Sequence, residues 1–368
     1  MGYKDAVISE AEKIRRLYTY NTLPVVYAYL GYQKKYKSMS DCAKDTEIGK
    51  LGNKVLEEIS LALQNEFGFS KEDMDSWNEK AVKDLTRLLS NENPNTLGNN
   101  PEERLKRDEV LIGPAILCKK NGILPYYLTK VIAFAFLYDN PLDEAACAIQ
   151  KFMGDYGTRQ TIVKYCQLER DPEIVQLVLE HYNKAAGGGS LNEDDERIDI
   201  IKHAYKLGFN YESTYRGCAQ CTLAAFFDLT GKRDQMLFQT ASGFSGGMSL
   251  CGDGPCGGYS GSTMLIGSYV GRRLERIPVD GDKEAQYKAY GMAQRLHDKF
   301  VETYGSVICA DIHTNIFGRA YCLRTESVRN EFDAAGAHKD KCTTVVATAC
   351  MWLAEILLDE GFINLSKT

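Results

Sequence analysis

The sequence lacks an uninterrupted hydrophobic run long enough to cross a lipid bilayer. Its longest purely apolar run, residues 131–138, is much shorter than the roughly 20 residues that a transmembrane helix needs. The chain begins Met1-Gly2-Tyr3-Lys4-Asp5, which does not start a secretory signal peptide. These absences predict a cytoplasmic protein that does not enter the membrane.

Three further absences exclude classes of partner and cofactor. The formal net charge is −6 at pH 7, so the sequence lacks the basic surplus that nucleic-acid phosphates attract. No Gly-x-Gly-x-x-Gly follows a strand-like segment, so no NAD site is predicted on this chain. No Cys-x2-Cys-His is present, so covalent haem attachment is not indicated.

What the sequence does contain is helical periodicity over most of its 368 residues, without strand-length alternating segments. This length and a 44% hydrophobic content favour two buried cores. We therefore predict an all-α protein with two helical domains, residues 1–185 and 197–368. A glycine-rich and then acidic segment, 186–196, is the predicted linker.

Two local predictions follow from proline and glycine. Residues 6–30 are expected to form one long helix or two joined helices, with the break at Pro24. Residues 193–208 are expected to form a helix that Gly208 ends.

The cysteines are unevenly distributed. Of the twelve, eight fall in the last 151 residues, several of them in the glycine-rich stretch 217–271. A cytoplasmic protein keeps ordinary disulfides reduced, so these thiols indicate metal, cluster or redox chemistry. The eight are Cys218, Cys221, Cys251, Cys256, Cys309, Cys322, Cys342 and Cys350.

The N-terminal part resembles a known family. Five short segments carry the resemblance: 18–22, 28–32, 111–115, 121–123 and 137–139. Over residues 8–185 the chain resembles the C-terminal substrate domain of mannitol-1-phosphate 5-dehydrogenases and related long-chain polyol dehydrogenases. The resemblance implies an NAD-binding Rossmann domain before this one, and the sequence begins where that domain would end.

The family's catalytic motif is Lys-x4-Asn-x2-His, and the chain departs from it. Aligned on Asn21, it has Arg16 in place of the lysine and Pro24 in place of the histidine. Arginine stays protonated, so it cannot act as the base, and proline has no titrating group. We expect Arg16 and Asn21 to line at most a vestigial substrate pocket. Alternatively, Asn21 caps a helix and Arg16 is a solvated surface residue.

The C-terminal part resembles a second family. Segments 208–210, 218–220, 242–248, 256–261, 304–309 and 341–342 resemble the C_GCxxG_C_C family of redox-active proteins over about 195–360. The resemblance implies a helical bundle in which four cysteines converge, as catalytic residues or metal ligands: Cys218, Cys256, Cys309 and Cys342. Its glycines correspond to Gly257 and Gly261, which we predict to contact a bound cofactor.

This chain adds thiols to the family pattern. Cys221 forms Cys-x2-Cys with Cys218, Cys251 forms Cys-x4-Cys with Cys256, and Cys322 follows Cys309. The three extra cysteines are therefore predicted as further ligands of an iron–sulfur cluster or another metal ion. A dithiol/disulfide couple and purely structural thiols remain alternatives.

We predict an oxidoreductase-like, cysteine-based redox protein with a degenerate dehydrogenase-like domain as a scaffold for docking or oligomerisation. It is not expected to be an autonomous NAD-dependent mannitol-1-phosphate dehydrogenase, and its redox partner is unknown. The alternative is a non-catalytic assembly subunit that pairs with a separate Rossmann-bearing chain or binds a sugar phosphate. The two hypotheses differ in whether the C-terminal thiols are reactive.

Overall fold

The fold is helical, as the sequence predicts. A computed structural model describes residues 9–88, 91–189 and 194–363. Within these residues there is no β-strand, only an isolated antiparallel bridge between Pro255 and Ile308. The chain divides into unit 1, residues 1–169 and 174–192, and unit 2, residues 170–173 and 193–368. Part of the predicted linker, residues 190–193, lies outside the described residues.

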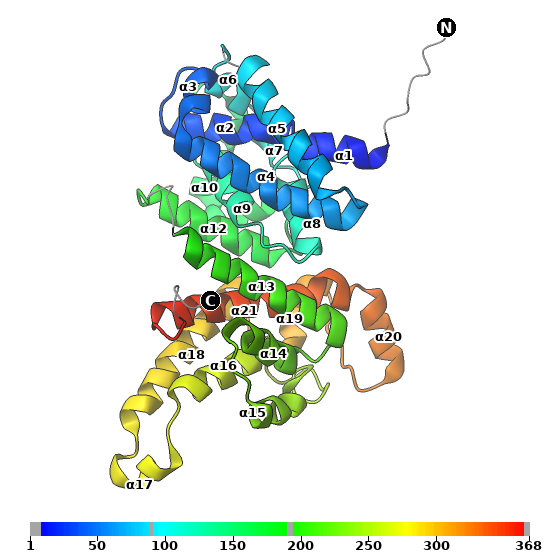
Figure 1. Cartoon of the computed structure of the whole chain (residues 1–368), viewed down its shortest axis with the longest axis vertical. Helices are drawn as coiled ribbons and strands as arrows, with labels where there is room; N and C mark the ends of the chain where they lie inside the picture. The colour runs from blue at the N-terminus through cyan, green and yellow to red at the C-terminus, as the bar shows by residue number, and fades with distance from the viewer. Residues whose placement is uncertain (1–8, 89–90, 190–193, 364–368) are drawn as a thin grey trace. The chain divides into compact units, whose positions relative to one another are not determined.

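The helices of unit 1 are named in Figure 1. They are α1 (Glu10–Tyr18), α2 (Thr22–Gln33), α3 (Met39–Lys44), α4 (Thr46–Phe67), α5 (Lys71–Leu88), α6 (Pro94–Gly98), α7 (Pro101–Arg104), α8 (Ile112–Lys120), α9 (Tyr126–Phe136), α10 (Glu144–Tyr156), α11 (Thr158–Cys166) and α12 (Pro172–Ala186). The first two residues of α12 are grouped with unit 2.

Unit 2 is built in the same way from helices and short helical turns. They are α13 (Asp195–Tyr215), α14 (Cys218–Thr230), α15 (Gln235–Thr240), η1 (Ala241–Phe244), α16 (Gly257–Val270), η2 (Leu274–Arg276), α17 (Ile277–Asp280), α18 (Lys283–Tyr304), α19 (Cys309–Phe317), α20 (Glu326–Ala334), η3 (Ala337–Lys341) and α21 (Cys342–Asp359).

The predicted break at Pro24 is three residues too late. α1 ends at Tyr18 and α2 begins at Thr22, so Pro24 lies in the first turn of α2. Proline is tolerated there because the first backbone N–H groups of a helix have no acceptor within the helix. The chain turns instead at residues 19–21, with Asn21 at the N-cap position of α2.

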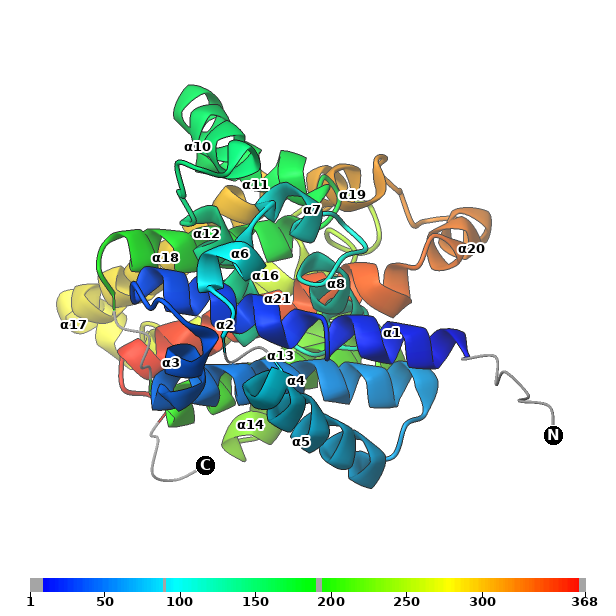
Figure 2. The same cartoon turned by 90° about the horizontal axis from the view of Figure 1, so that it is seen from above.

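Unit 1 packs around α2 and α9, whose apolar residues are buried on almost every face. Figure 2 shows α4 running alongside α1 and α2, and α4 also packs on α8 and α9. Edge-on packing of Tyr29 and Tyr138, with ring centroids 5.5 Å apart, joins α2 to the segment after α9. This unit therefore has a core of its own.

Asp45 holds the start of α4. Its Oδ1 accepts the backbone N–H groups of Glu47 and Ile48 at 2.9 and 3.0 Å, while its Oδ2 accepts Lys34 Nζ and the Tyr36 hydroxyl, both at 2.7 Å. Burial alone would raise the pKa of Asp45, but these hydrogen bonds outweigh it and lower the pKa to about 2. We expect Asp45→Asn to reduce the free energy of unfolding in urea by about 1–3 kcal/mol at pH 7.

This effect should depend on pH with a definite sign. Because the pKa of Asp45 is lower in the folded chain, its stabilisation is complete above about pH 4 and is lost as the pH falls towards about 2. The matched control is Asp75→Asn, since Asp75 pairs with Lys71 at 2.6 Å on an exposed surface. We expect that control to change stability by less than about 0.5 kcal/mol. Equal effects of the two substitutions would contradict the assignment.

The centre of unit 2 is the pair α13 and α21, which lie side by side in Figures 1 and 2. The prediction that Gly208 ends the first helix is wrong, because α13 continues to Tyr215. A Cβ at Gly208 would lie 2.7 Å from Cys350 Sγ and 3.1 Å from Ala347 Cα. This glycine therefore permits close approach of α21.

Within the described residues, one helix is long and apolar enough to cross a membrane, judged by its length and composition alone. It is the continuous segment Ala337–Asp359, and 78% of the window that passes is buried inside the protein. The sequence prediction did not single it out because threonines interrupt its apolar residues. Its burial is that of a core helix, around which α13, α14, α16 and α18 pack.

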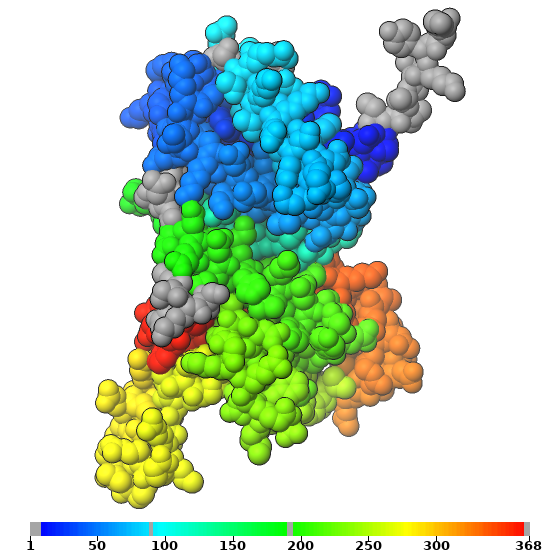
Figure 3. All heavy atoms as spheres, viewed as in Figure 1, coloured from blue at the N-terminus to red at the C-terminus, as the bar shows by residue number. Residues whose placement is uncertain are grey.

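The segment between α16 and α18 extends away from the rest of unit 2. Figure 3 shows this arm as the yellow region that carries α17. Its large apolar side chains are exposed, among them Leu274 at 82% and Val279 at 71%. The arm takes no part in the cavity described below.

Candidate functional site

Four helices of unit 2 begin at cysteines. Cys218, Cys309 and Cys342 are the first residues of α14, α19 and α21. Cys256 is the N-cap residue of α16. At Cys218, Cys256 and Cys309 the helix N-terminus carries free N–H groups and partial positive charge, which favour an anionic sulfur. Cys342 differs, because a π-helical turn precedes it and its N–H donates to Ala337 O. These four positions are the ones that the sequence predicts as the central cysteines.

The glycine-rich loop before α16 brings Cys256 beside the start of α19. The N–H of Cys256 donates to Val307 O at 2.8 Å, and the N–H of Cys309 donates to Gly254 O at 3.0 Å. At Gly247, where φ is +58°, a Cβ would lie 2.6 Å from Cys309 Cβ. Only a residue without a side chain lets the loop lie this close to α19.

Close packing of α14 on α16 places Cys218 next to Cys256. A Cβ at Gly257 would lie 2.2 Å from Cys218 Sγ, and one at Gly261 would lie 2.6 Å from Ala219 O. Both glycines were predicted to contact a cofactor. The structure places them at the contact between the two helices, and their contact with a cofactor stays a prediction.

The four cysteines line one cavity of about 170 Å³. Apolar side chains form much of its wall, together with six charged or titratable side chains besides the cysteines. The lining includes Cys218, Cys256, Cys309, Cys342, His313, Glu212, Arg216, Asp333, His338, Arg329, Leu250, Ile312, Leu323, Phe332, Val345 and Val346. Cys256 and Cys309 are buried, whereas Cys218 and Cys342 are partly exposed.

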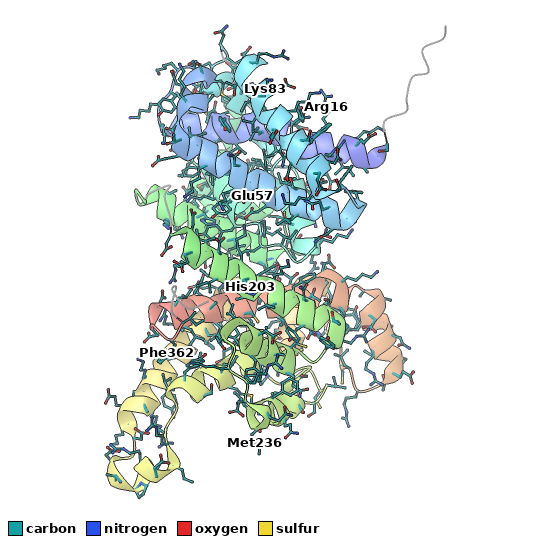
Figure 4. All side chains as sticks on the ribbon, in the orientation of Figure 1. Arg16, Glu57, Lys83, His203, Met236 and Phe362 are labelled. Atoms are coloured by element: carbon teal, nitrogen blue, oxygen red, sulfur yellow. The ribbon has the colours of Figure 1, made fainter. Side chains whose placement is uncertain are left out.

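In unit 1 the residues aligned with the dehydrogenase motif are exposed. Arg16 lies on the outer face of α1, with its guanidinium carbon 5.9 Å from the centre of the Tyr20 ring (Figure 4). Asn21 is exposed and makes no side-chain capping hydrogen bond. The neighbouring Arg15 is the buried arginine, stacked 4.0 Å from the centre of the Trp77 ring.

Comparison with protein families matches residues 10–205 to the model described as "Mannitol dehydrogenase C-terminal domain". The chain belongs to this family. Its relatives include the mannitol-1-phosphate 5-dehydrogenases of Thermoanaerobacter pseudethanolicus, 29% identical over 170 residues, and Bacillus pumilus, 30% identical over 165 residues. These matches cover 46% and 45% of this chain and 44% and 43% of the relatives. The chain thus spans less than half the length of either relative.

A second family model matches residues 217–356 and is described as "Putative redox-active protein (C_GCAxxG_C_C)". Both resemblances predicted from the sequence are thereby confirmed. The mannitol dehydrogenase C-terminal domain match falls mainly in unit 1, and the redox-family match falls in unit 2. All four cavity cysteines lie within the redox-family match.

Burial raises the pKa values of the four cavity thiols, which favours their protonated form at neutral pH. Burial is the largest effect on each, and it raises the pKa of Cys218 to about 12 and that of Cys256 to about 11. It also raises the pKa values of Cys309 and Cys342. A bound cation or an oxidation step would therefore have to remove the protons.

Backbone N–H groups counteract burial at two of the sulfurs. Gly246 and Gly257 donate to Cys218, and Gly258 and Tyr259 donate to Cys256, and each of these hydrogen bonds lowers the thiol pKa. They come from the glycine-rich loop and from the first turn of α16. The high glycine content of 217–271, from which the sequence predicted a site, thus has two effects. The glycines let the helices and the loop pack closely, and some of them donate N–H groups to the sulfurs.

His313 lies between two of the thiols. Its Nε2 is 3.4 Å from Cys309 Sγ and 3.7 Å from Cys342 Sγ. The side chain is 2% exposed, and burial lowers its pKa to about 4, so the ring is neutral. Its buried Nδ1 has no hydrogen-bond partner in the described part of the chain.

A group of titratable side chains borders the thiols and was not predicted. Glu212 Oε1 is 3.6 Å from His338 Nδ1, and His338 Nε2 is 3.5 Å from Asp333 Oδ1. Arg216 pairs with Asp333 at 3.0 Å. Burial raises the pKa of Glu212 to about 8. The position of Glu212, four residues after Gly208 on the buried face of α13, is the signal that could have identified it.

The three additional cysteines do not line the cavity. Cys221 is buried, and its thiol donates to Arg216 O at 3.1 Å. Cys251 and Cys322 are exposed. Among the residues that the structure describes, no group of three or more His, Cys, Asp or Glu side chains is arranged to hold a metal ion.

Proposed function

We propose that the chain is a cysteine-based redox protein and that Cys218, Cys256, Cys309 and Cys342 hold an iron–sulfur cluster. The observation that carries this proposal is the meeting of four cysteines, three of them at helix N-termini, around one cavity of about 170 Å³. When bound, such a cluster would supply electron transfer.

The donor set favours a cluster over a single metal ion. Four thiolates are the usual ligands of an iron–sulfur cluster. A single zinc ion needs its four ligands within about 2.3 Å of one point, whereas the four cysteines line a cavity of about 170 Å³. Sulfurs spread around a cavity are better suited to a group of several atoms.

Residues around the thiols support this assignment. The N–H groups of Gly246, Gly257 and Gly258 point at sulfurs, and such hydrogen bonds stabilise anionic sulfur and tune its potential. Phe332 and Val346 contribute to an apolar wall that limits water. Together these groups would compensate buried negative charge and exclude solvent.

The experiment is anaerobic reconstitution of the full chain with ferrous iron and sulfide, followed by removal of unbound metal. We expect a brown protein with visible absorption that bleaches on reduction, and bound iron and labile sulfide in matching amounts. A colourless protein that retains neither element would overturn the cluster. Unreactive thiols in that protein would favour the assembly-subunit alternative.

A dithiol/disulfide couple is the second candidate, and one contact favours it. Cys218 and Cys221 lie three residues apart at the start of α14, and Glu212 is close enough to Cys221 to raise the pKa of its thiol further, beyond the larger effect of burial. With its pKa raised to about 8, Glu212 becomes a carboxylate only towards higher pH, where it could accept a thiol proton as a disulfide forms. If this candidate is correct, oxidised glutathione would remove two hydrogen atoms from the metal-free chain and join Cys218 to Cys221. Two free thiols after this treatment would exclude it.

For the mannitol dehydrogenase C-terminal unit we propose a scaffold role without sugar-phosphate turnover. Arg16 and Pro24 replace the proton-accepting lysine and the histidine of the motif, and Arg16 and Asn21 are exposed. We expect neither mannitol 1-phosphate nor fructose 6-phosphate to raise the thermal unfolding midpoint. A ligand at 100 times its dissociation constant would add about 2.7 kcal/mol to stability, which is readily measured.

The control for this prediction is the Bacillus pumilus mannitol-1-phosphate 5-dehydrogenase, which should be stabilised by mannitol 1-phosphate under the same conditions. A saturable shift in the present chain would show that the unit still binds sugar phosphate. Loss of that shift in Arg16→Ala would then locate the binding site.

A further inference from the structure

Two loop segments of unit 2, far apart in the sequence, run against each other beside the cavity. The N–H of Leu323 donates to Leu250 O at 3.0 Å. Two residues further along the first segment, a Cβ at Gly252 would lie 3.2 Å from Tyr321 O. Position 250 therefore faces 323 and position 252 faces 321, so the segments are antiparallel.

This register places Cys251 opposite Cys322. Both cysteines are exposed and both are free thiols. In each segment the exposed cysteine separates residues that are buried or half-buried, so both side chains point to the solvent side. The segments are not β-strands, since Leu250 and Gly252 have φ angles of +70° and +85°. The backbone contacts on either side of the pair, between 250 and 323 and between 252 and 321, nevertheless hold the two cysteines where a disulfide, which needs Cα atoms about 4.4–6.8 Å apart, can form.

We propose that Cys251 and Cys322 form a reversible surface disulfide and that this pair is a second thiol site, separate from the four-cysteine cavity. The sequence assigned both residues to the central ligand set. Their exposure, and their absence from the cavity lining, separate them from it. The inference is independent of the proposed cluster.

The oxidant is a low-molecular-weight disulfide, for which an exposed pair is accessible. The thiolate of one cysteine attacks a sulfur of the reagent, forms a mixed disulfide and releases one thiol. The second cysteine then displaces the other half of the reagent as a second thiol. Two protein thiols are oxidised to one disulfide, and one external disulfide is reduced to two thiols.

The bridge would act on the cavity through its neighbours. Leu250 precedes Cys251 and Leu323 follows Cys322, and both leucines line the cavity. They also pack together in a small core with Tyr321 and Phe332. A disulfide would fix two stretches of this wall to each other.

The test uses the full, metal-free chain, reduced and then equilibrated with oxidised and reduced glutathione. Remaining thiols are blocked with N-ethylmaleimide, and peptides are mapped without reduction. We expect a peptide pair linked through Cys251 and Cys322. The exposed Cys147 of unit 1 is the internal control and should not be cross-linked within the chain. In Cys251→Ser, glutathione should remain attached to Cys322, and in Cys322→Ser to Cys251.

Two results would overturn the proposal. One is wild-type protein in which Cys251 and Cys322 each carry glutathione, which would mean that the two sulfurs do not meet. The other is a link from either residue to Cys218 or Cys342. The Cys251→Ser and Cys322→Ser variants should take up iron as the wild type does. Failure of the cluster in the wild type would leave the cross-linking result unchanged, so the two proposals fail separately.

Discussion

Replacing Cys256 with serine is expected to abolish retention of iron by the reconstituted chain. The substitution exchanges one sulfur for oxygen with little change in shape, while the N–H groups of Gly258 and Tyr259 remain directed at the site. Loss of groups that only orient metal ligands costs about 10- to 100-fold in affinity, and loss of a ligand should cost at least as much. Iron and labile sulfide per chain, measured after gel filtration, provide the readout.

The other three cavity cysteines make this prediction specific. Serine at Cys218, Cys309 or Cys342 should have the same effect, because a cluster needs all of its ligands. A dithiol couple would instead produce two sensitive and two insensitive positions. Cys147→Ser, on the exposed surface of unit 1, is the matched control and should retain iron fully. Circular dichroism of the metal-free variants separates loss of iron from loss of fold.

The central site could be predicted from the sequence because its signals are local. Cysteine at the start of a helix and glycine beside it both depend on neighbours within a few residues, and both hold at Cys218 and Cys256. The prediction that sulfur atoms distant in sequence share one cavity depended on the family resemblance. Composition alone could not have selected these four cysteines from eight.

The errors arose where tertiary contacts decide the role of a residue. Gly208 looks like a helix stop in the sequence, but it admits Cys350 from the facing helix. The ligand roles of Cys251 and Cys322 stay predictions, but both residues are exposed and lie outside the cavity lining. Their actual neighbours are set by the pairing of two loops, and no local pattern encodes that register. His338 could not be placed either, because it precedes Cys342 in a π-helical turn.

Because α14 and α16 are in close contact, we expect Gly261→Ala to destabilise unit 2 and to impair iron uptake. The added methyl group would lie 2.6 Å from Ala219 O and 3.0 Å from Thr222 Cβ. Ala219 O is a backbone atom within a helix, so it cannot move away alone. Overpacking of this kind costs about 1–3 kcal/mol. The separation of the two helices would also displace Cys218, which begins α14, from Cys256.

A matched control lies two turns further along the same helix. At Gly267 a Cβ would have no atom within 4 Å, and the residue is exposed. Gly267→Ala should therefore stabilise α16 by about 0.5–1 kcal/mol, because alanine loses less backbone entropy than glycine on folding. Urea unfolding should thus give opposite signs for the same chemical change at two positions of one helix. If both variants were stabilised and bound iron normally, α14 and α16 would not be in close contact, and the four-cysteine cavity would lose its geometric basis.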